Sequence, residues 1–285
     1  MKAQLIDGKR ISAEIKAEAA EEAAALKAKG ITPCLAVVLV GDDSASQVYV
    51  NNKKKACEAV GIRSVSHVLS GETTEEALLE LIAKLNADQN IHGILVQMPV
   101  PKQIDERKVI LAIDPKKDVD CFHPVNVGNL HTGGEGFLPC TPAGIIELIK
   151  RSGHSIEGKQ CVVIGRSNIV GKPVAMLLMQ ENGTVTICHS RTRNLAEICR
   201  GADIIVSAVG KVNTVTADMV KEGAILIDVG MNRNEAGKLC GDVDFENVKE
   251  IAGAITPVPG GVGPMTIAML MKNCNIAAKI QNGLE

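Results

Sequence analysis

The sequence predicts an α/β protein with two lobes, each built on a parallel sheet, and with long helices joining the lobes. Three observations predict this class. The chain has 285 residues, which is enough for two lobes of ordinary size. Short apolar strands alternate with amphipathic helices along its length. A tight glycine turn directly follows a buried strand in the second half of the chain.

Seven short runs rich in apolar and β-branched residues predict strands. They cover residues 34–40, 64–69, 93–97, 160–164, 184–188, 203–208 and 224–229. Helical segments separate most of them, which is typical of parallel strands joined by crossover helices. We therefore expect two parallel sheets rather than hairpins.

Glycine and proline mark the expected helix ends. A helix over about 11–29 stops at Gly30, and a second over about 46–60 stops at Gly61. A loop-rich interval, residues 115–142, separates the third strand from the fourth. We place the domain junction there, with one domain over 1–140 and another over 141–263. Helices starting at 141 and 264 are the expected connectors, and the last, 264–285, completes the first domain.

Composition narrows the possible partners. The 31 basic and 33 acidic side chains leave no cationic surface for nucleic acid, so a small molecule is favoured. The charged start of the chain and the lack of a run of about 18 apolar residues argue against a signal peptide and a membrane span. Nine cysteines without a CxxC pair argue against a disulfide framework and against a metal site. A soluble protein of the reducing cytoplasm fits best.

The stretch KQCVVIGRSNIVGKP, residues 159–173, is the most informative part of the chain. Its apolar half predicts a central strand, Gly165 permits a tight turn, and Gly171 with Pro173 opens a helix whose backbone N–H groups can face a pyrophosphate. This indicates a Rossmann-type nucleotide lobe. The alternative is a glycine needed only for packing between strand and helix.

The end of the next strand distinguishes the two nicotinamide cofactors. An NAD site expects an acidic residue there, about 20 residues past the turn, to bind the ribose hydroxyls. Residues 187–193 read ICHSRTR, with no carboxylate and with arginines at Arg191 and Arg193. Cations suit a 2′-phosphate, so NADP is favoured. The alternative interpretation is that Arg191 and Arg193 lie in an ordinary solvated loop and bind no cofactor.

The first lobe offers three candidate site residues. Tyr49 and Lys53 are four apart on a predicted helix and so share a face, although Lys53 also begins an ordinary basic run. Gln97 ends the third strand, where ligands of parallel sheets gather and where it can reach Lys53. Asp120 lies in the loop KKDVDCFHP, and its carboxylate could accept hydrogen bonds from the donors of a heterocycle. The alternative interpretation is an aspartate in a turn that caps its own backbone.

Together these segments resemble the methylenetetrahydrofolate dehydrogenase/cyclohydrolases, bifunctional folate enzymes of one-carbon metabolism and purine biosynthesis. The resemblance spans the chain. Its matching stretches are VGDDSASQVYV at 40–50, Lys53, GILVQMP at 93–99, KDVD at 117–120, PCTPAG at 139–144, VIGRSNIVGKP at 163–173, IDVGMN at 227–232 and ITPVPGGVGPMT at 255–266. The order of YxxxK, VQxP, KDVD and PGGVGP is far more specific than any one of these motifs.

The resemblance implies roles for matching residues. Lys53 resembles the lysine that manages the proton of the attacking water, with Gln97 holding it. Tyr49 resembles the side chain that stacks on the folate, and Asp120 the carboxylate that anchors the pterin. Other implied folate contacts are Val96, Met98, Pro259, Gly260, Gly261, Val262 and Gly263. Implied NADP contacts are Gly165, Arg166, Ser167, Ser190, Arg191 and Met231, in a cleft between an N-terminal catalytic lobe and the nucleotide lobe. No metal is implied.

One position departs from the family pattern. The family usually has glycine after the KDVD aspartate, and this chain has Cys121. If the loop needs a positive φ there, a cysteine costs about 1 kcal/mol or more. We therefore expect either a shifted loop or a changed folate affinity. Cys121 is expected to be a passive loop residue rather than a reactive thiol.

Three other functions are consistent with parts of this sequence. A short-chain dehydrogenase also uses YxxxK, but its nucleotide turn comes first, and here Tyr49 precedes Gly165. A non-catalytic folate- or nucleotide-binding protein would be expected to lack Lys53 or Gln97. A monofunctional dehydrogenase is the nearest alternative. The resemblance also implies a homodimer formed through the nucleotide lobe.

Overall fold

The computed structural model describes residues 3–284, which form two compact units. The six-stranded unit holds the described residues up to Ala13 together with Thr141–Thr266. The three-stranded unit holds Glu14–Cys140 together with the described residues from Ile267 onward. Helices α1 (Gly8–Ala28) and α10 (Val262–Gln281) begin in the first of these units and end in the second.

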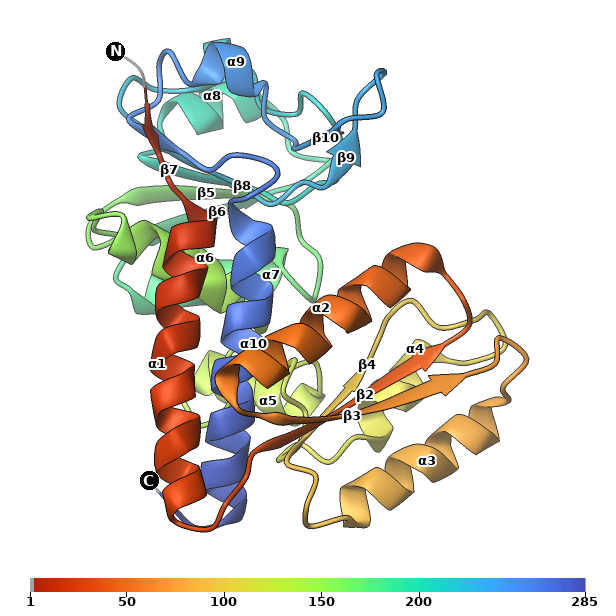
Figure 1. The fold of residues 1–285 in the computed structure, drawn as a ribbon. Coiled ribbons are helices and arrows are strands. Elements are labelled where there is room, and N and C mark those ends of the chain that lie inside the picture. Colours follow the sequence, from red (N-terminus) through yellow and green to blue (C-terminus); the bar gives the residue numbers. More distant parts are fainter. Residues whose placement is uncertain (1–2, 285) are drawn as a thin grey trace. The chain divides into compact units, whose positions relative to one another are not determined.

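The three-stranded unit is a parallel sheet covered on both faces. Its strand order is β3–β2–β4, with bounds Arg63–Leu69, Cys34–Val40 and Gly93–Val96. Helix α2 (Ser44–Val60) covers one face, and α3 (Glu75–Ala87) and α4 (Glu106–Ala112) cover the other (Figure 1). All seven residues of β2 are buried, because this central strand has helices on both sides. The sequence prediction of a parallel sheet is confirmed here.

Helix ends in this unit follow the expected signals. The Asp43 carboxylate accepts a hydrogen bond from the Ser46 backbone N–H at 2.7 Å and so caps the start of α2. Gly61 ends the same helix in the left-handed conformation, at φ +80°.

In the second half of α1, the backbone oxygen of Ala19 accepts from the Asn275 side chain at 2.8 Å, so α1 and α10 lie side by side there (Figure 1).

The loop-rich interval predicted over residues 115–142 also contains a helix. Helix α5 (Pro124–Thr132) lies within it. His123 caps its first turn, Pro124 occupies the first helical position, where its missing N–H costs nothing, and Gly133 ends it at φ +71°. Of the glycines in this interval, Gly133, Gly134 and Gly136 follow the helix, and Gly128 lies within it.

The six-stranded unit is a doubly wound parallel sheet. Its order is β1–β11–β8–β7–β5–β6, with bounds Gln4–Leu5, Ala254–Ile255, Ile225–Asp228, Ile204–Ser207, Gln160–Ile164 and Thr184–Cys188. Helices α6 (Cys140–Arg151) and α7 (Gly171–Gln180) cover one face, and α8 (Leu195–Arg200) and α9 (Phe245–Val248) the other (Figure 1). A 3₁₀ turn (Ala217–Met219) and the small hairpin β9–β10 (Asn232–Arg233, Leu239–Cys240) complete this unit.

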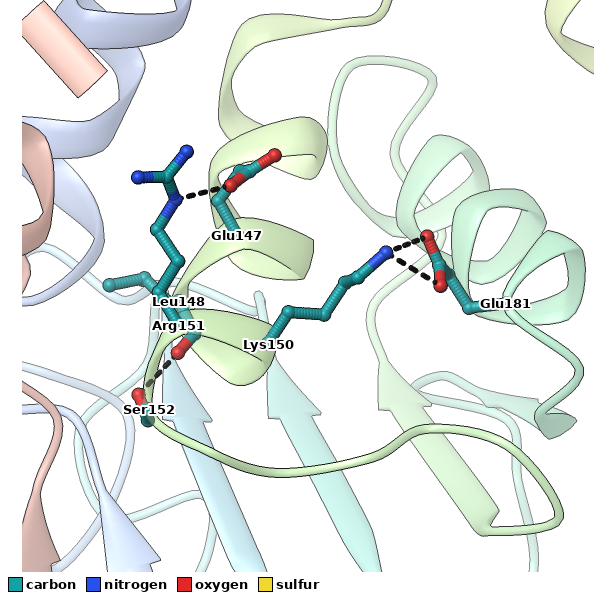
Figure 2. A network of polar contacts seen from close by, with 6 residues as sticks. All are labelled: Glu147, Leu148, Lys150, Arg151, Ser152 and Glu181. Carbon is teal, nitrogen blue, oxygen red and sulfur yellow. Dashed lines mark hydrogen bonds and ion pairs between the residues drawn. The ribbon is translucent and has the colours of Figure 1, made fainter. Parts of the chain in front are cut away.

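Ion pairs join the ends of α6 and α7. Lys150, in the last turn of α6, reaches both carboxylate oxygens of Glu181 at 2.9 and 3.0 Å (Figure 2). Arg151 pairs with Glu147 one turn earlier in α6, at 2.7 Å, and the Ser152 hydroxyl bonds to the Leu148 carbonyl (Figure 2). These partly exposed pairs contribute little individually, and of them the Lys150–Glu181 pair joins α6 to the end of α7.

Among residues 3–284, no helix combines the length and the apolar character needed to cross a membrane.

Candidate functional site

Lys53 and Gln97 form a direct hydrogen bond in the three-stranded unit. Lys53 lies on α2 and is only 8% exposed, whereas its neighbours Lys54 and Lys55 are exposed. Its Nζ donates to Gln97 Oε1 at 2.9 Å. Gln97 directly follows β4, and its Nε2 donates to the Met98 carbonyl at 2.8 Å, which turns the amide oxygen toward the ammonium. The reading of Lys53 as part of a solvated basic run is therefore wrong.

Asp120 lies beyond the same end of the sheet. The Ile94 N–H donates to the Lys117 carbonyl at 2.8 Å, and Ile94 and Asp118 form a parallel bridge, so the KDVD segment extends the sheet beside β4. Burial raises the pKa of the Asp120 carboxyl, the positive charge of Lys53 opposes the rise, and Asp118 adds to it. Asp120 as a whole residue is partly exposed, whereas its carboxyl group is enclosed by the protein. Lys53, Gln97 and Asp120 thus share one site.

Buried polar side chains that sequence analysis missed hold the Asp120 loop. The Lys117 Nζ donates to three carbonyls at the end of α3, those of Leu85, Asn86 and Asp88, at 2.7–3.0 Å. Asp118 accepts from the His123 N–H and from the Asn126 side chain at 2.8 and 2.9 Å. Asn273, on α10, donates to the Val119 carbonyl at 2.8 Å. The first two lie inside the KDVD motif, but only the fold reveals their partners.

Cys121 adopts the conformation that usually calls for glycine. Its φ is +61°, so the condition under which a cysteine at this position carries backbone strain is met. The side chain is 1% exposed, and its Sγ donates to the Phe137 carbonyl at 3.2 Å. Burial raises the pKa of the Cys121 thiol to about 12. A buried thiol with a raised pKa is a poor nucleophile, which favours the passive role.

Tyr49 lies one helical turn before Lys53 on α2, and it is 38% exposed. A half-open phenol on the same face as a buried lysine suits contact with a flat ligand. Val96 is buried at the end of β4, and Met98 is partly exposed. The structure thus places Tyr49 beside the site and Val96 largely within the core.

Gly165 forms the predicted turn after β5 in the six-stranded unit. Its φ is +125°, and a Cβ there would lie 2.4 Å from the Ala208 carbonyl oxygen, so only glycine fits. Ser167 Oγ accepts from the N–H groups of Val170 and Gly171 at 3.2 Å, which caps the start of α7. The turn and helix are as predicted. Arg166 and Ser167 are exposed beside them.

The end of β6 carries cations and no carboxylate. Ser190, Arg191 and Arg193 are exposed there. The backbone forms a compact turn here. In this turn the His189 N–H donates to Thr192 Oγ1 at 2.8 Å, and the Arg191 N–H donates to His189 Nδ1 at 3.1 Å. In the part of the chain that the structure describes, neither guanidinium forms an ion pair. Met231, after β8, is 56% exposed.

The segment Pro259–Gly263 belongs to the six-stranded unit and includes the first two residues of α10. Gly260 has φ +106°, which favours glycine. A Cβ on Gly261 would meet the Pro257 carbonyl oxygen and the Thr256 side chain, both at 2.7 Å. Gly261 is therefore required by packing of the protein against itself, a reason that the sequence alone does not indicate.

Two family models match this chain. A model of the tetrahydrofolate dehydrogenase/cyclohydrolase catalytic domain matches residues 6–120, and a model of the NAD(P)-binding domain of the same family matches residues 139–282. The chain belongs to this family. The resemblance read from the motifs is thereby confirmed, and the tetrahydrofolate dehydrogenase/cyclohydrolase models together cover most of both units.

Individual members of the family are similar over nearly their whole length. A bifunctional protein FolD of Agathobacter rectalis is 62% identical over 277 residues, which cover 97% of this chain and 99% of the relative. The crystal structure of the FolD dehydrogenase/cyclohydrolase of Campylobacter jejuni has a TM-score of 0.95 at 53% identity, covering 98% and 99% of the two chains. The FolD of Trypanosoma brucei, solved with NADP cofactor and an inhibitor, has a TM-score of 0.92 at 42% identity, with 98% of each chain covered.

Proposed function

We propose that this chain oxidises 5,10-methylenetetrahydrofolate with NADP and then hydrolyses the resulting 5,10-methenyltetrahydrofolate to 10-formyltetrahydrofolate. Membership of the tetrahydrofolate dehydrogenase/cyclohydrolase family, across both of its domains, supports both activities. One observation carries the proposal furthest. A buried lysine, Lys53, is held by Gln97 at 2.9 Å, with the Asp120 carboxyl close enough for its pKa to respond to the lysine.

The residues of the six-stranded unit fit NADP. Gly165 allows the tight turn after β5, where a Cβ would meet the Ala208 carbonyl oxygen. Arg191 and Arg193 offer exposed guanidinium groups at the end of β6, where an NAD site would present a carboxylate. NADP, when bound, supplies the hydride acceptor of the first reaction. We assign Gly165, Arg166, Ser167, Ser190, Arg191 and Met231 to its binding.

The chain's own part in the first step is to position the folate. Asp120 suits the adjacent ring N–H and amino donors of the pterin, and the Tyr49 ring suits its flat face. Pro259–Gly263, with Val96, Gln97 and Met98, are the further proposed folate contacts. The step needs geometry and exclusion of water more than an acid or a base, so holding these side chains in place is the main requirement.

Lys53 acts in the second step. Water adds to the one-carbon bridge of the methenyl cation, the bond from that carbon to N5 breaks, and the formyl group stays on N10. Lys53 Nζ manages the proton of the attacking water, and Gln97 Oε1 holds the ammonium in place. Asp120, with Lys53 nearby, retains the folate while water attacks.

We further propose a cytoplasmic homodimer that does not bind nucleic acid. The near balance of charge, a net −2, supports the absence of a nucleic-acid partner. Strand β6 lies at the end of the sheet order and pairs with β5 on one side. An open strand edge of this kind is available for pairing with a second copy, which supports a dimer through the six-stranded unit.

The decisive experiment supplies 5,10-methylenetetrahydrofolate with NADP and, separately, with NAD. Reduced nicotinamide and the methenyl compound are both followed optically in the same reaction. Reduced NADP without lasting methenyl, after correction for spontaneous hydrolysis, supports both activities. Accumulating methenyl compound would leave a monofunctional dehydrogenase, and no reduction with either cofactor would overturn the dehydrogenase assignment.

A further inference from the structure

Asp242 is completely buried in the six-stranded unit, and its carboxylate binds two separate loops. Five donors reach it, all within 3.2 Å. Oδ2 accepts from Ser207 Oγ and from the backbone N–H groups of Val209 and Gly210, and Oδ1 from the Lys211 N–H and the Asn232 side chain. Three successive backbone N–H groups therefore point at one side chain, an arrangement that holds an anion.

Burying the Asp242 carboxyl in the core carries a free-energy cost that an apolar side chain would not carry. Within residues 3–284, no lysine or arginine forms an ion pair with Asp242, and the donors to its side chain are a hydroxyl, an amide and three backbone N–H groups. Burying a carboxyl costs several kcal/mol in general, and an apolar residue of similar size would often be at least as stabilising. Because the Asp242 oxygens accept hydrogen bonds from the backbone N–H groups of a loop, this buried side chain fixes the geometry of that loop.

The first of the loops borders the nucleotide turn. Val209–Lys211 follows β7, which pairs with β5 through Ser207 and Ile164. The Ala208 carbonyl lies 2.4 Å from the place of a Cβ on Gly165, so the residue before this loop closes the turn. The chain reverses its winding between β5 and β7, and ligands of such sheets bind there, beyond the carboxyl ends of the strands.

The second loop contains Met231. Asn232, which donates to Asp242, directly follows it, and Gly230, which precedes it, donates to Asp228 Oδ1 at 3.0 Å. Asp228 also accepts from the Asp242 N–H at 2.8 Å. The backbone is thus fixed on both sides of Met231, while the Met231 side chain remains 56% exposed.

We propose that Asp242 is a positioning residue for NADP, holding the loops after β7 and β8 in the geometry that the cofactor meets. The proposal rests on the cofactor site assigned above to Gly165 and Met231. Asp242 lies too deep to touch a ligand itself, and it acts through the backbone of Val209–Lys211 and through Asn232.

Asp242→Asn tests this role. The amide has the same shape, but in either orientation its NH₂ group faces N–H donors that the carboxylate accepted. We expect the dissociation constant for NADP, measured by titration calorimetry, to rise about tenfold or more, and the KM for NADP to rise with it. Hydrolysis of 5,10-methenyltetrahydrofolate without NADP should stay within twofold, because Lys53 and Gln97 lie in the other unit.

Asp218→Asn is the matched control, because Asp218 is an aspartate of the same unit whose side chain accepts from Thr216 at 2.6 Å. If Asp242→Asn does not fold, Ser207→Ala removes only one of the five donors and should raise the dissociation constant for NADP about threefold. Unchanged NADP binding in the folded variant would overturn the proposal. So would an equal loss of hydrolysis and NADP binding, which indicates general instability. Failure of the unmodified protein to bind NADP would instead remove the cofactor assignment.

Discussion

The ammonium of Lys53 lies 2.9 Å from the amide oxygen of Gln97, so one hydrogen bond joins helix α2 to the end of strand β4. The glutamine cannot turn freely, because its NH₂ group is bound to the Met98 carbonyl at 2.8 Å. The Lys53 side chain is held by helix α2 at its Cα and by Gln97 at its Nζ, so it loses little further conformational entropy when a substrate binds. Such preorganisation is what a proton-handling group requires.

Lys53→Met should separate the two activities. The thioether has similar length but cannot handle a proton, so we expect hydrolysis of 5,10-methenyltetrahydrofolate to fall about 100-fold or more while part of the NADP reduction remains. Each reaction is assayed separately with its own substrate. Lys54→Met is the control, because that side chain is exposed on the same helix. Equal loss of both reactions would contradict this division of labour.

Arg191→Ala should weaken NADP more than NAD. The exposed guanidinium can pair with a 2′-phosphate that NAD lacks, and a charge-assisted contact of this kind changes the ratio of kcat/KM values for the two cofactors about tenfold. Arg200→Ala serves for comparison, because Arg200 binds the Asp218 carbonyl at 3.2 Å. A parallel loss with both cofactors would assign Arg191 to a contact that the two share.

The strands were the part of the fold most readily predicted. The runs at 34–40, 160–164 and 184–188 match β2, β5 and β6 in both bounds. The inner strands β2 and β5 are nearly continuous apolar runs, and the edge strand β6 is a run of mostly β-branched residues between turn residues. Strands β1 and β11 were missed. Each has two residues, and each is a strand only because it pairs with a neighbour far away in the chain.

The site was predictable where a motif places a residue at a strand end. Gln97 and Gly165 follow directly from that rule. Lys117 and Asp242 did not, because a charged residue in a loop gives no signal of its burial. Their partners, the carbonyls at the end of α3 and the N–H groups after β7, are about 30 residues away in the sequence.

Cys121 allows left-handed strain to be separated from side-chain packing. Cys121→Ala keeps the Cβ at φ +61° but removes the thiol that contacts the Phe137 carbonyl, so we expect a loss of about 1 to 2 kcal/mol. Cys121→Gly loses the same packing but relieves the backbone, so it should be about 1 kcal/mol more stable than the alanine variant. Urea unfolding of the three proteins measures both differences. A glycine variant less stable than the alanine variant would show that the loop carries no such strain.

Asp228 should make stability depend on pH. Burial raises the pKa of its carboxyl to about 6, against the lowering effect of hydrogen bonds from the backbone of Asp242, Val243 and Gly230. In the unfolded chain the pKa is about 4, so between about pH 4 and 6 the folded protein binds the proton more tightly. The Asp228 contribution to stability is therefore fully present below about pH 4 and is lost as the pH rises through 6. Its full extent corresponds to about 3 kcal/mol, as an upper bound.

Asp228→Asn removes this titration. The variant loses acceptor capacity and should be less stable than the unmodified protein at pH 5, but the gap should narrow by about 1 kcal/mol or more at pH 7, where the unmodified protein carries a buried charge beside Asp242. Urea unfolding of both proteins at the two pH values measures the change, with Asp218→Asn as the surface control. A gap that widens toward pH 7 would mean that the three backbone donors outweigh burial and that the folded carboxyl prefers its charged form.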